Sequence, residues 1–220
     1  MKKYLLLPIA FLFLNIWGNF LKAQEQSIIP DLSKVENENT WTENNRVAVK
    51  KGEVHLKEQP GSELVALKNF TFSNGTIEVD IKGKDLQGQS FVGIAFHIEN
   101  DSTYDAIYFR AFNFKNPERK NHAVQYISHP EFSWDKLRRE NYGEYENAIN
   151  PVPDPNDWFH ATIEVAYPNV KVFINHAKEP ALEVQQLSNQ KQGLVGFWVP
   201  ELSEGSFRNL KITLLKKELQ

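Results

Sequence analysis

Five polar and aromatic side chains that could hold a ligand occur at alternate positions of predicted β-strands: His97, Tyr108, Arg110, Gln125 and Trp198. Alternate residues of a strand point to opposite faces of a sheet, so these five share one face if the apolar residues beside them face the core. Tryptophan and tyrosine rings can stack on the apolar faces of a sugar, while arginine, glutamine and histidine can hydrogen-bond its hydroxyl groups. The set favours a saccharide ligand, although each residue taken singly could also serve the fold.

Further candidates lie in an insertion, residues 128–157, that is rich in proline, aromatic and charged residues. Long irregular insertions in compact domains are uncommon and are often functional. We expect this one to cap one side of a sheet, with one or two helical turns at 133–139. Its predicted ligand-binding residues are Trp134, Arg138 and Tyr145.

If the chain is an enzyme, we expect its general acid and base among His97, Glu131 and Glu146, because imidazole and carboxyl groups can exchange protons near neutral pH. Three other histidines could act as a base or as a metal ligand: His122, His129 and His160. The glutamates of the insertion could instead form a solvated loop, salt-bridged to its arginines.

No histidine spacing predicts a metal site, and we expect no cofactor. A calcium ion could bind near Asn100, Asp101 and Asp105, but such clusters at loop starts more often form turns. The chain has no cysteine, which excludes disulfides, thiolate metal sites and cysteine nucleophiles.

We expect these residues to be carried by short strands separated by turns, because the sequence shows little helical periodicity. The predicted strands span 47–49, 53–56, 64–67, 76–81, 91–97, 106–110, 123–127, 159–165, 170–174, 194–199 and 210–214. Many short strands at near-regular spacing predict an all-β antiparallel sandwich or barrel.

The same alternation predicts which residues of four central strands face the core: Val92, Ile94, Phe96, Ile107, Phe109, Val124, Tyr126, Val195, Phe197 and Val199. On the opposite face, Gly93, Ala95 and Gly196 are small and are expected to leave room above the sheet.

Residues 1–23 have the pattern of a secretory signal peptide, since two lysines precede a short apolar run that ends before Ala23. The run is shorter than the roughly 20 residues that span a bilayer, so we expect no membrane span after its removal. We predict export to the periplasm or exterior of a Gram-negative bacterium, a flexible segment over 24–40 and one β-sandwich domain over 41–216. Cleavage would change the formal charge from −3 to −6, because the segment holds three lysines and no acid. Without a basic surplus, nucleic acid is not an expected partner.

Motifs in the C-terminal half carry a family resemblance. The predicted hairpin at 158–175, the Gly-Leu-Val-Gly-Phe run at 193–197 and the Phe-Arg-Asn-Leu-Lys-Ile run at 207–212 resemble the framework of the concanavalin A-like (laminin G-like) jelly roll. More narrowly, the chain is similar to secreted bacterial 3-keto-disaccharide hydrolase-like or laminarinase-like proteins over most of residues 41–214. The resemblance implies a two-sheet antiparallel jelly-roll sandwich with one long aromatic-rich insertion.

The chain also departs from related enzymes. Laminarinase-type enzymes carry paired carboxylates in a Glu-x-Asp-x-x-Glu strand, whereas Glu78-Val79-Asp80 lacks the second glutamate. No predicted strand carries the Arg-x-Glu motif of alginate-lyase-type enzymes, and their Gln-x-His motif is also missing. We therefore expect an exported protein of a glycan-utilisation system that binds an oligo- or polysaccharide on the concave sheet face. The alternatives are a glycoside-cleaving enzyme, either a hydrolase or a lyase, and a structural or adhesive protein.

Overall fold

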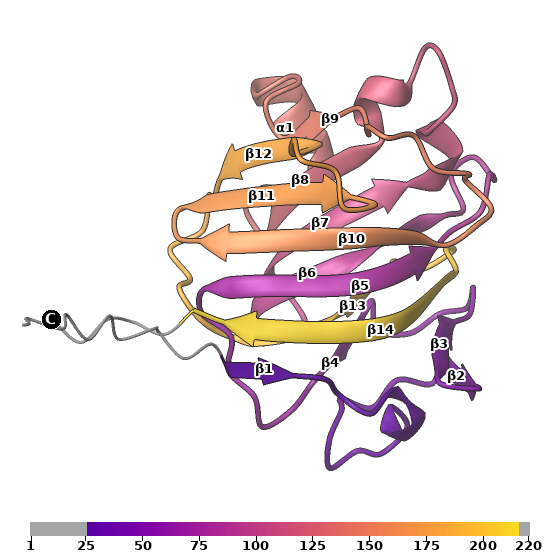
Figure 1. Cartoon of the computed structure of the whole chain (residues 1–220), viewed down its shortest axis with the longest axis vertical. Coiled ribbons are helices and arrows are strands. Elements are labelled where there is room, and N and C mark those ends of the chain that lie inside the picture. The colour runs from indigo at the N-terminus through magenta and orange to yellow at the C-terminus, as the bar shows by residue number, and fades with distance from the viewer. Residues whose placement is uncertain (1–25, 216–220) are drawn as a thin grey trace, which may run out of the picture.

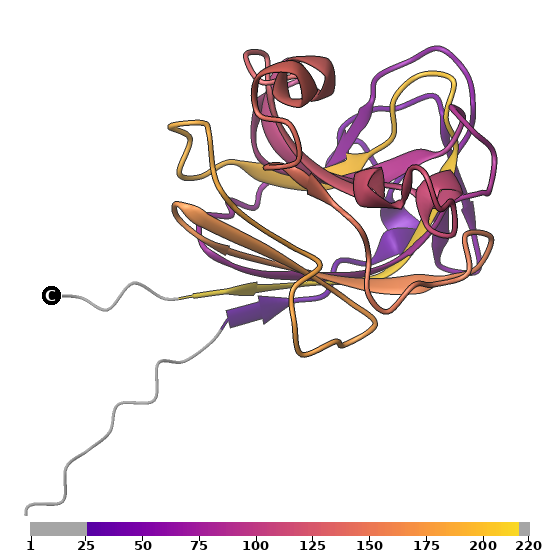
Figure 2. The same cartoon turned by 90° about the horizontal axis from the view of Figure 1, so that it is seen from above.

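The protein is a sandwich of two antiparallel sheets in a computed structural model that describes residues 26–215 (Figure 1). The larger sheet has the strand order β12-β11-β10-β5-β14-β3-β2, with β1 paired to β14, and the smaller sheet has the order β4-β13-β6-β7-β8-β9. Figure 2 shows the two layers edge-on. The predicted all-β, two-sheet fold is confirmed, and the predicted signal peptide, 1–23, lies outside the described residues.

The eight-stranded sheet consists of β1 (Gln26–Ile28), β2 (Val47–Lys50), β3 (Glu53–Leu56), β5 (Gly75–Lys82), β10 (Phe159–Ala166), β11 (Asn169–Ile174), β12 (Leu182–Gln185) and β14 (Gly205–Leu214). The six-stranded sheet consists of β4 (Leu64–Ala66), β6 (Phe91–Asn100), β7 (Thr103–Arg110), β8 (Val124–His129), β9 (Glu146–Asn147) and β13 (Leu194–Trp198). The helical segments are α1 (Trp134–Glu140) and the single 3-10 turns η1 (Leu32–Lys34), η2 (Ala111–Asn113) and η3 (Lys120–His122).

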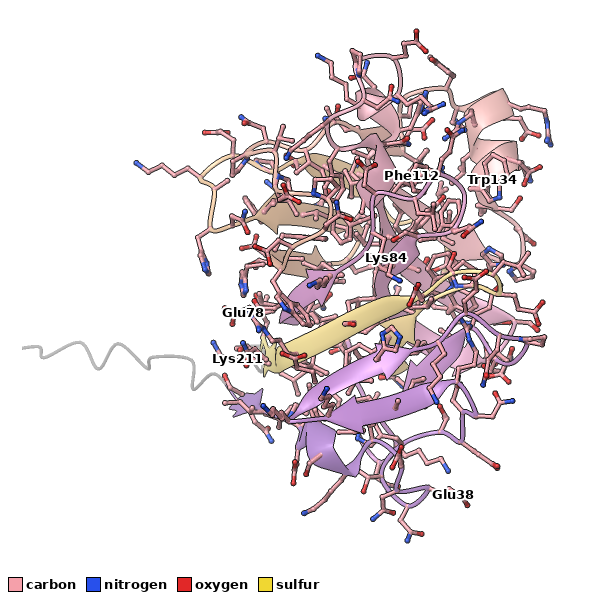
Figure 3. The ribbon with its side chains drawn as sticks, turned by 90° about the vertical axis from the view of Figure 1, so that its right-hand side faces the viewer. Glu38, Glu78, Lys84, Phe112, Trp134 and Lys211 are labelled. Carbon is pink, nitrogen blue, oxygen red and sulfur yellow. The ribbon has the colours of Figure 1, made fainter. Side chains whose placement is uncertain are left out.

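The core lies between the sheets and follows the alternation of the strands. In β5, Ile77, Val79 and Ile81 are buried, while the intervening Glu78 faces out and pairs with Lys211 at 2.6 Å (Figure 3). All ten residues predicted to face inward from β6, β7, β8 and β13 belong to this core. The parity of these four strands is therefore confirmed for their apolar positions.

The segment 24–40, predicted to be flexible, contributes to the folded domain where the structure describes it. Strand β1 pairs with the end of β14, and Leu32 and Val35 are buried in the core. The described part of this segment is therefore packed into the sandwich.

The insertion covers the outer face of the six-stranded sheet. Its helix, α1, begins after Ser133 as predicted, and it lies on the side of this sheet away from the other sheet (Figure 2). Leu137 is buried against the outer-face residues Tyr108 and Trp198 in a second, smaller apolar cluster. Strand β9 then pairs with β8 and forms the edge of the sheet. No helix within residues 26–215 is long and apolar enough to cross a membrane.

Candidate functional site

An aromatic floor lies on the outer face of the six-stranded sheet. Trp198 and Tyr108 are both buried, and their ring centroids are 4.9 Å apart. They flank Gly93 in the sheet, because Trp198 and Tyr108 both pair with that residue. A Cβ at Gly93 would lie 2.7 Å from Tyr108 Cβ, which is too close for a larger residue. The space that we expected above this glycine is therefore filled by the rings of Trp198 and Tyr108.

A cavity of about 510 Å³ opens above this floor. Three more aromatic side chains line it, Phe91 from β6, Phe112 from η2 and Trp134 from α1. Figure 3 shows Phe112 and Trp134 at the same end of the molecule. The polar and charged lining residues are Glu63, Gln87, Arg110, Asn113, Arg119, His122, His129, Ser133, Arg138 and Glu201. The cavity thus combines apolar rings with hydrogen-bonding groups.

Arg110 lies beside Tyr108 and is held by neutral side chains and by Glu146. Its guanidinium donates hydrogen bonds to the Tyr108 hydroxyl and to Gln125 Oε1, and Nη1 lies 3.4 Å from Glu146 Oε2. The Tyr108 hydroxyl donates to the same Gln125 oxygen at 2.8 Å. Burial raises the pKa of Tyr108 to about 12, so this hydroxyl stays protonated, while burial lowers the pKa of Arg110.

Glu146 is the shared counter-ion of this region. Arg138 donates to both of its oxygens, at 3.0 and 2.6 Å, and His122 Nδ1 lies 2.8 Å from Oε1. Burial acts to raise the pKa of Glu146, but the bonds and charges of Arg138, His122 and Arg110 outweigh it and hold the pKa below its usual value. Glu146 does not line the cavity. The predicted general acid is thus an ionised carboxylate already paired to two arginines.

His97 does not share the face of the other four candidates, so this expectation was wrong. The pairing of β6 with β7 shifts between Phe96 and Asn100, and His97 has a positive φ of 49°. This bulge turns the ring inward, where it is fully buried beside Phe72 and Phe96. Its Nε2–H donates to the carbonyl of Ser73 at 2.7 Å, and Nδ1 is 3.1 Å from Gln186 Nε2. His97 therefore lies in the interior and away from the cavity.

Two other predicted residues also lie apart from the cavity. Glu131 is exposed and lines a separate, smaller hollow of about 200 Å³ beside Leu187. Tyr145 is half-buried and packs beside Tyr126, with ring centroids 5.9 Å apart. Gln125 does not line the cavity either, but it hydrogen-bonds to Tyr108 and Arg110, which do. The structure thus brings Tyr108, Arg110, Trp134, Arg138 and Trp198 together on the cavity wall.

Several cavity residues were not predicted from the sequence. Phe91, Phe112, Asn113, Arg119 and Glu63 line the cavity, and none of them stood out by period or motif. Phe91 and Phe112 flank predicted strands that carry candidate residues, so aromatic residues at those strand ends were the one available signal.

Glu63 and His129 line the cavity, and both contact Tyr104. Tyr104 accepts a hydrogen bond from Trp198 Nε1 at 3.0 Å and donates to Glu63 Oε2 at 3.2 Å. The ring of His129 stacks on that of Tyr104, with centroids 5.0 Å apart. Burial lowers the pKa of His129, against the opposing effect of Glu63. The imidazole of His129 and the carboxyl group of Glu63 therefore lie beside the aromatic floor.

The calcium ligands considered above do not gather. Asp105 faces the interior and accepts hydrogen bonds from Tyr126 and Ser188, and Asn100 Oδ1 accepts one from the backbone N–H of Ser102. Within residues 26–215, no group of three or more histidine, aspartate or glutamate side chains is arranged to hold a metal ion.

Solved structures with the same fold include several proteins with sugar-related names. A putative glycosyl hydrolase from Parabacteroides distasonis superposes with a TM-score of 0.59 at 13% identity, covering 87% of this chain and 100% of that one. The carbohydrate-binding module CBM66 from Bacillus subtilis gives 0.56 at 18% identity, covering 79% and 95%. The exoplasmic/lumenal domain of VIP36, bound to Ca²⁺ and Man3GlcNAc, gives 0.55 at 11% identity, covering 88% and 90%. At these low identities, the superpositions show a shared fold and nothing more.

Sequence comparison gives a narrower result. No curated protein matches the chain. The family described as 3-keto-alpha-glucoside-1,2-lyase-like domain matches residues 30–213, which is most of the chain. The predicted resemblance is confirmed, and the protein belongs to the 3-keto-alpha-glucoside-1,2-lyase-like domain family.

Proposed function

We propose that the protein binds a saccharide in the cavity on the outer face of the six-stranded sheet, as an exported member of a glycan-utilisation system. The observation that supports this best is the composition of the cavity. Trp198 and Tyr108 form its floor, Phe91, Phe112 and Trp134 line it further, and arginine, asparagine and histidine side chains stand between them. Sugars present both apolar C–H faces and hydroxyl groups, so they suit such a mixture.

The fold relatives are consistent with this ligand class. One is a carbohydrate-binding module, and another was solved with Man3GlcNAc bound. Export rests on the composition of residues 1–23, which have the charged start and short apolar run of a signal peptide.

Trp134 offers a direct test, because it lines the cavity, is 49% exposed and belongs to neither apolar cluster. We expect Trp134→Ala to weaken glycan binding roughly tenfold, since it removes an aromatic stacking surface. Isothermal titration with a panel of neutral and acidic oligosaccharides measures the effect. Trp158→Ala is the matched control, because Trp158 lies under Arg208, at 4.2 Å, and does not line the cavity. Equal weakening by both variants, or no binding by the wild type, would contradict the proposal.

A second candidate function is cleavage of a glycosidic bond by hydrolysis or elimination. It is favoured by the family's name, which describes a lyase, and by Glu63 and His129 on the cavity wall. The same saccharide panel, assayed for product release, separates the two functions. Turnover that is lost in Glu63→Gln or His129→Gln would support cleavage, whereas stoichiometric binding without product would support recognition alone.

A further inference from the structure

A second hollow lies next to the cavity, because His129 lines both of them. It measures about 200 Å³ and lies between the turn after β8 and the segment that connects β12 to β13. Pockets that bind a small ligand by themselves usually measure roughly 300–1,000 Å³, so this hollow is small for a site of its own. Its size and its contact with the cavity point to a subsite for a ligand that the cavity already holds.

The walls of the second hollow combine an apolar surface with accessible polar groups. Phe132 and Leu187 supply the apolar surface, and both are half-buried. Glu131 and Asn189, one from each of the two segments, are exposed, so a ligand can reach them. Sugar hydroxyl groups can donate to a carboxylate and can both donate to and accept from an amide, while sugar C–H faces pack on an aromatic ring. The hollow thus repeats the mixture of groups found in the cavity.

One wall of this hollow is held by a network of buried polar groups. Asp105 is fully buried and accepts hydrogen bonds from Gln186 Nε2 at 3.0 Å and from Ser188 Oγ at 2.7 Å. The backbone N–H of Leu187 donates to the Tyr126 hydroxyl at 3.0 Å. A buried carboxylate is costly unless it is hydrogen-bonded, so these contacts are retained together. They fix the wall from inside the sandwich.

The opposite wall is fixed as well. Ser128 and Phe132 exchange two backbone hydrogen bonds, at 2.7 and 3.1 Å, which close the turn that carries Glu131. The ring of His129, between the two hollows, is stacked on that of Tyr104. Both walls are thus formed before a ligand arrives, which reduces the conformational entropy lost on binding.

We propose that the second hollow is a subsite for the outer rings of the saccharide whose first ring lies in the cavity. The preferred ligand is then a chain long enough to pass from the aromatic floor over His129 to Glu131 and Asn189. The inference rests on the proposed function, since the cavity must hold one end of the chain. It also gives Glu131 a role in binding, in place of the acid–base role expected from the sequence.

The dependence of affinity on chain length tests the subsite. Malto-, laminari-, manno- and galacturono-oligosaccharides of one to six rings are titrated into the mature chain by isothermal titration calorimetry. We expect the affinity of the series that binds to rise about tenfold at the step at which the chain reaches the second hollow, because about two hydrogen bonds are added there.

The double variant Glu131→Ala/Asn189→Ala should lose most of this gain and bind the short sugars as the wild type does, since neither residue lines the cavity. Trp134→Ala should instead weaken short and long sugars alike, because Trp134 lines the cavity. The matched control is Glu140→Ala/Asn169→Ala, because both of these residues are exposed and line neither hollow. Thermal unfolding checks that each variant is folded.

Three results would overturn the subsite and leave the cavity as the binding site. They are an affinity that does not change with chain length, a gain that survives in Glu131→Ala/Asn189→Ala, and an equal loss for short and long sugars in that variant. No binding by the wild type at any chain length would overturn the proposed function and the subsite with it.

Discussion

Glu146 illustrates how burial and partners decide what a residue can do. As a glutamate in an aromatic insertion it suggested a general acid, yet its two oxygens are occupied by Arg138 and it neutralises the deeply buried Arg110. A sequence contains the residue types but not these long-range pairings. The alternative interpretation, in which Glu146 is salt-bridged to the arginines of the insertion, describes its surroundings better than the interpretation as a general acid.

At this residue, Glu146→Gln should lower the free energy of unfolding by about 3 kcal/mol, because it leaves two arginine charges without their counter-ion. Urea unfolding monitored by circular dichroism measures the change. Glu140→Gln is the control, since Glu140 is exposed on α1 and lies 3.9 Å from Arg139. If Glu146→Gln leaves stability unchanged and abolishes an activity instead, the structural role is wrong.

At the scale of elements, the prediction of β6 shows what alternation can and cannot reveal. Val92, Ile94 and Phe96 face the core as predicted, but the bulge after Phe96 reverses the side of the next residue. A single inserted residue changes the sheet face to which the following side chains point. No glycine or proline within β6 after Phe96 marks the position of this bulge in the sequence. Helix α1 was predictable from its local composition, whereas β9 exists only because it pairs with β8, some twenty residues earlier in the chain.

The bulge has a consequence for pH dependence, because burial lowers the pKa of His97. The unfolded chain takes up a proton near pH 6.5 while the folded chain does not, so stability should fall as the pH drops below that value. Asp105, whose pKa burial raises, acts in the opposite direction at the acidic end.

The contribution of His97 can be measured by urea unfolding of the wild type and of His97→Gln at pH 7.5 and at pH 5.5. His97→Gln should reduce the loss of stability between these two values by about 1 kcal/mol relative to the wild type. Gln can still donate to the carbonyl of Ser73, so the variant keeps one native contact. The same dependence on pH in both proteins would mean that His97 titrates alike in the folded and unfolded chain.

At the scale of the whole molecule, the sandwich was predictable because apolar alternation alone determines which residues can form its core. The cavity was harder to predict from the sequence, because its wall combines β6, β7, β13, α1 and the η2–η3 segment with a loop before β4.

The chain has no disulfide to link its two sheets, but the buried Arg46 connects them by hydrogen bonds. Its guanidinium donates to backbone carbonyls on both sides of the sandwich, including those of Lys57 and Val199.

The central claim is that a saccharide binds on the outer face of the six-stranded sheet. The most direct measurement is a crystal structure of the protein with the tightest oligosaccharide of the panel. We predict density for a sugar ring in the cavity, above Trp198 and Tyr108 and beside Trp134. A sugar bound on the eight-stranded sheet, with this cavity empty, would contradict the account.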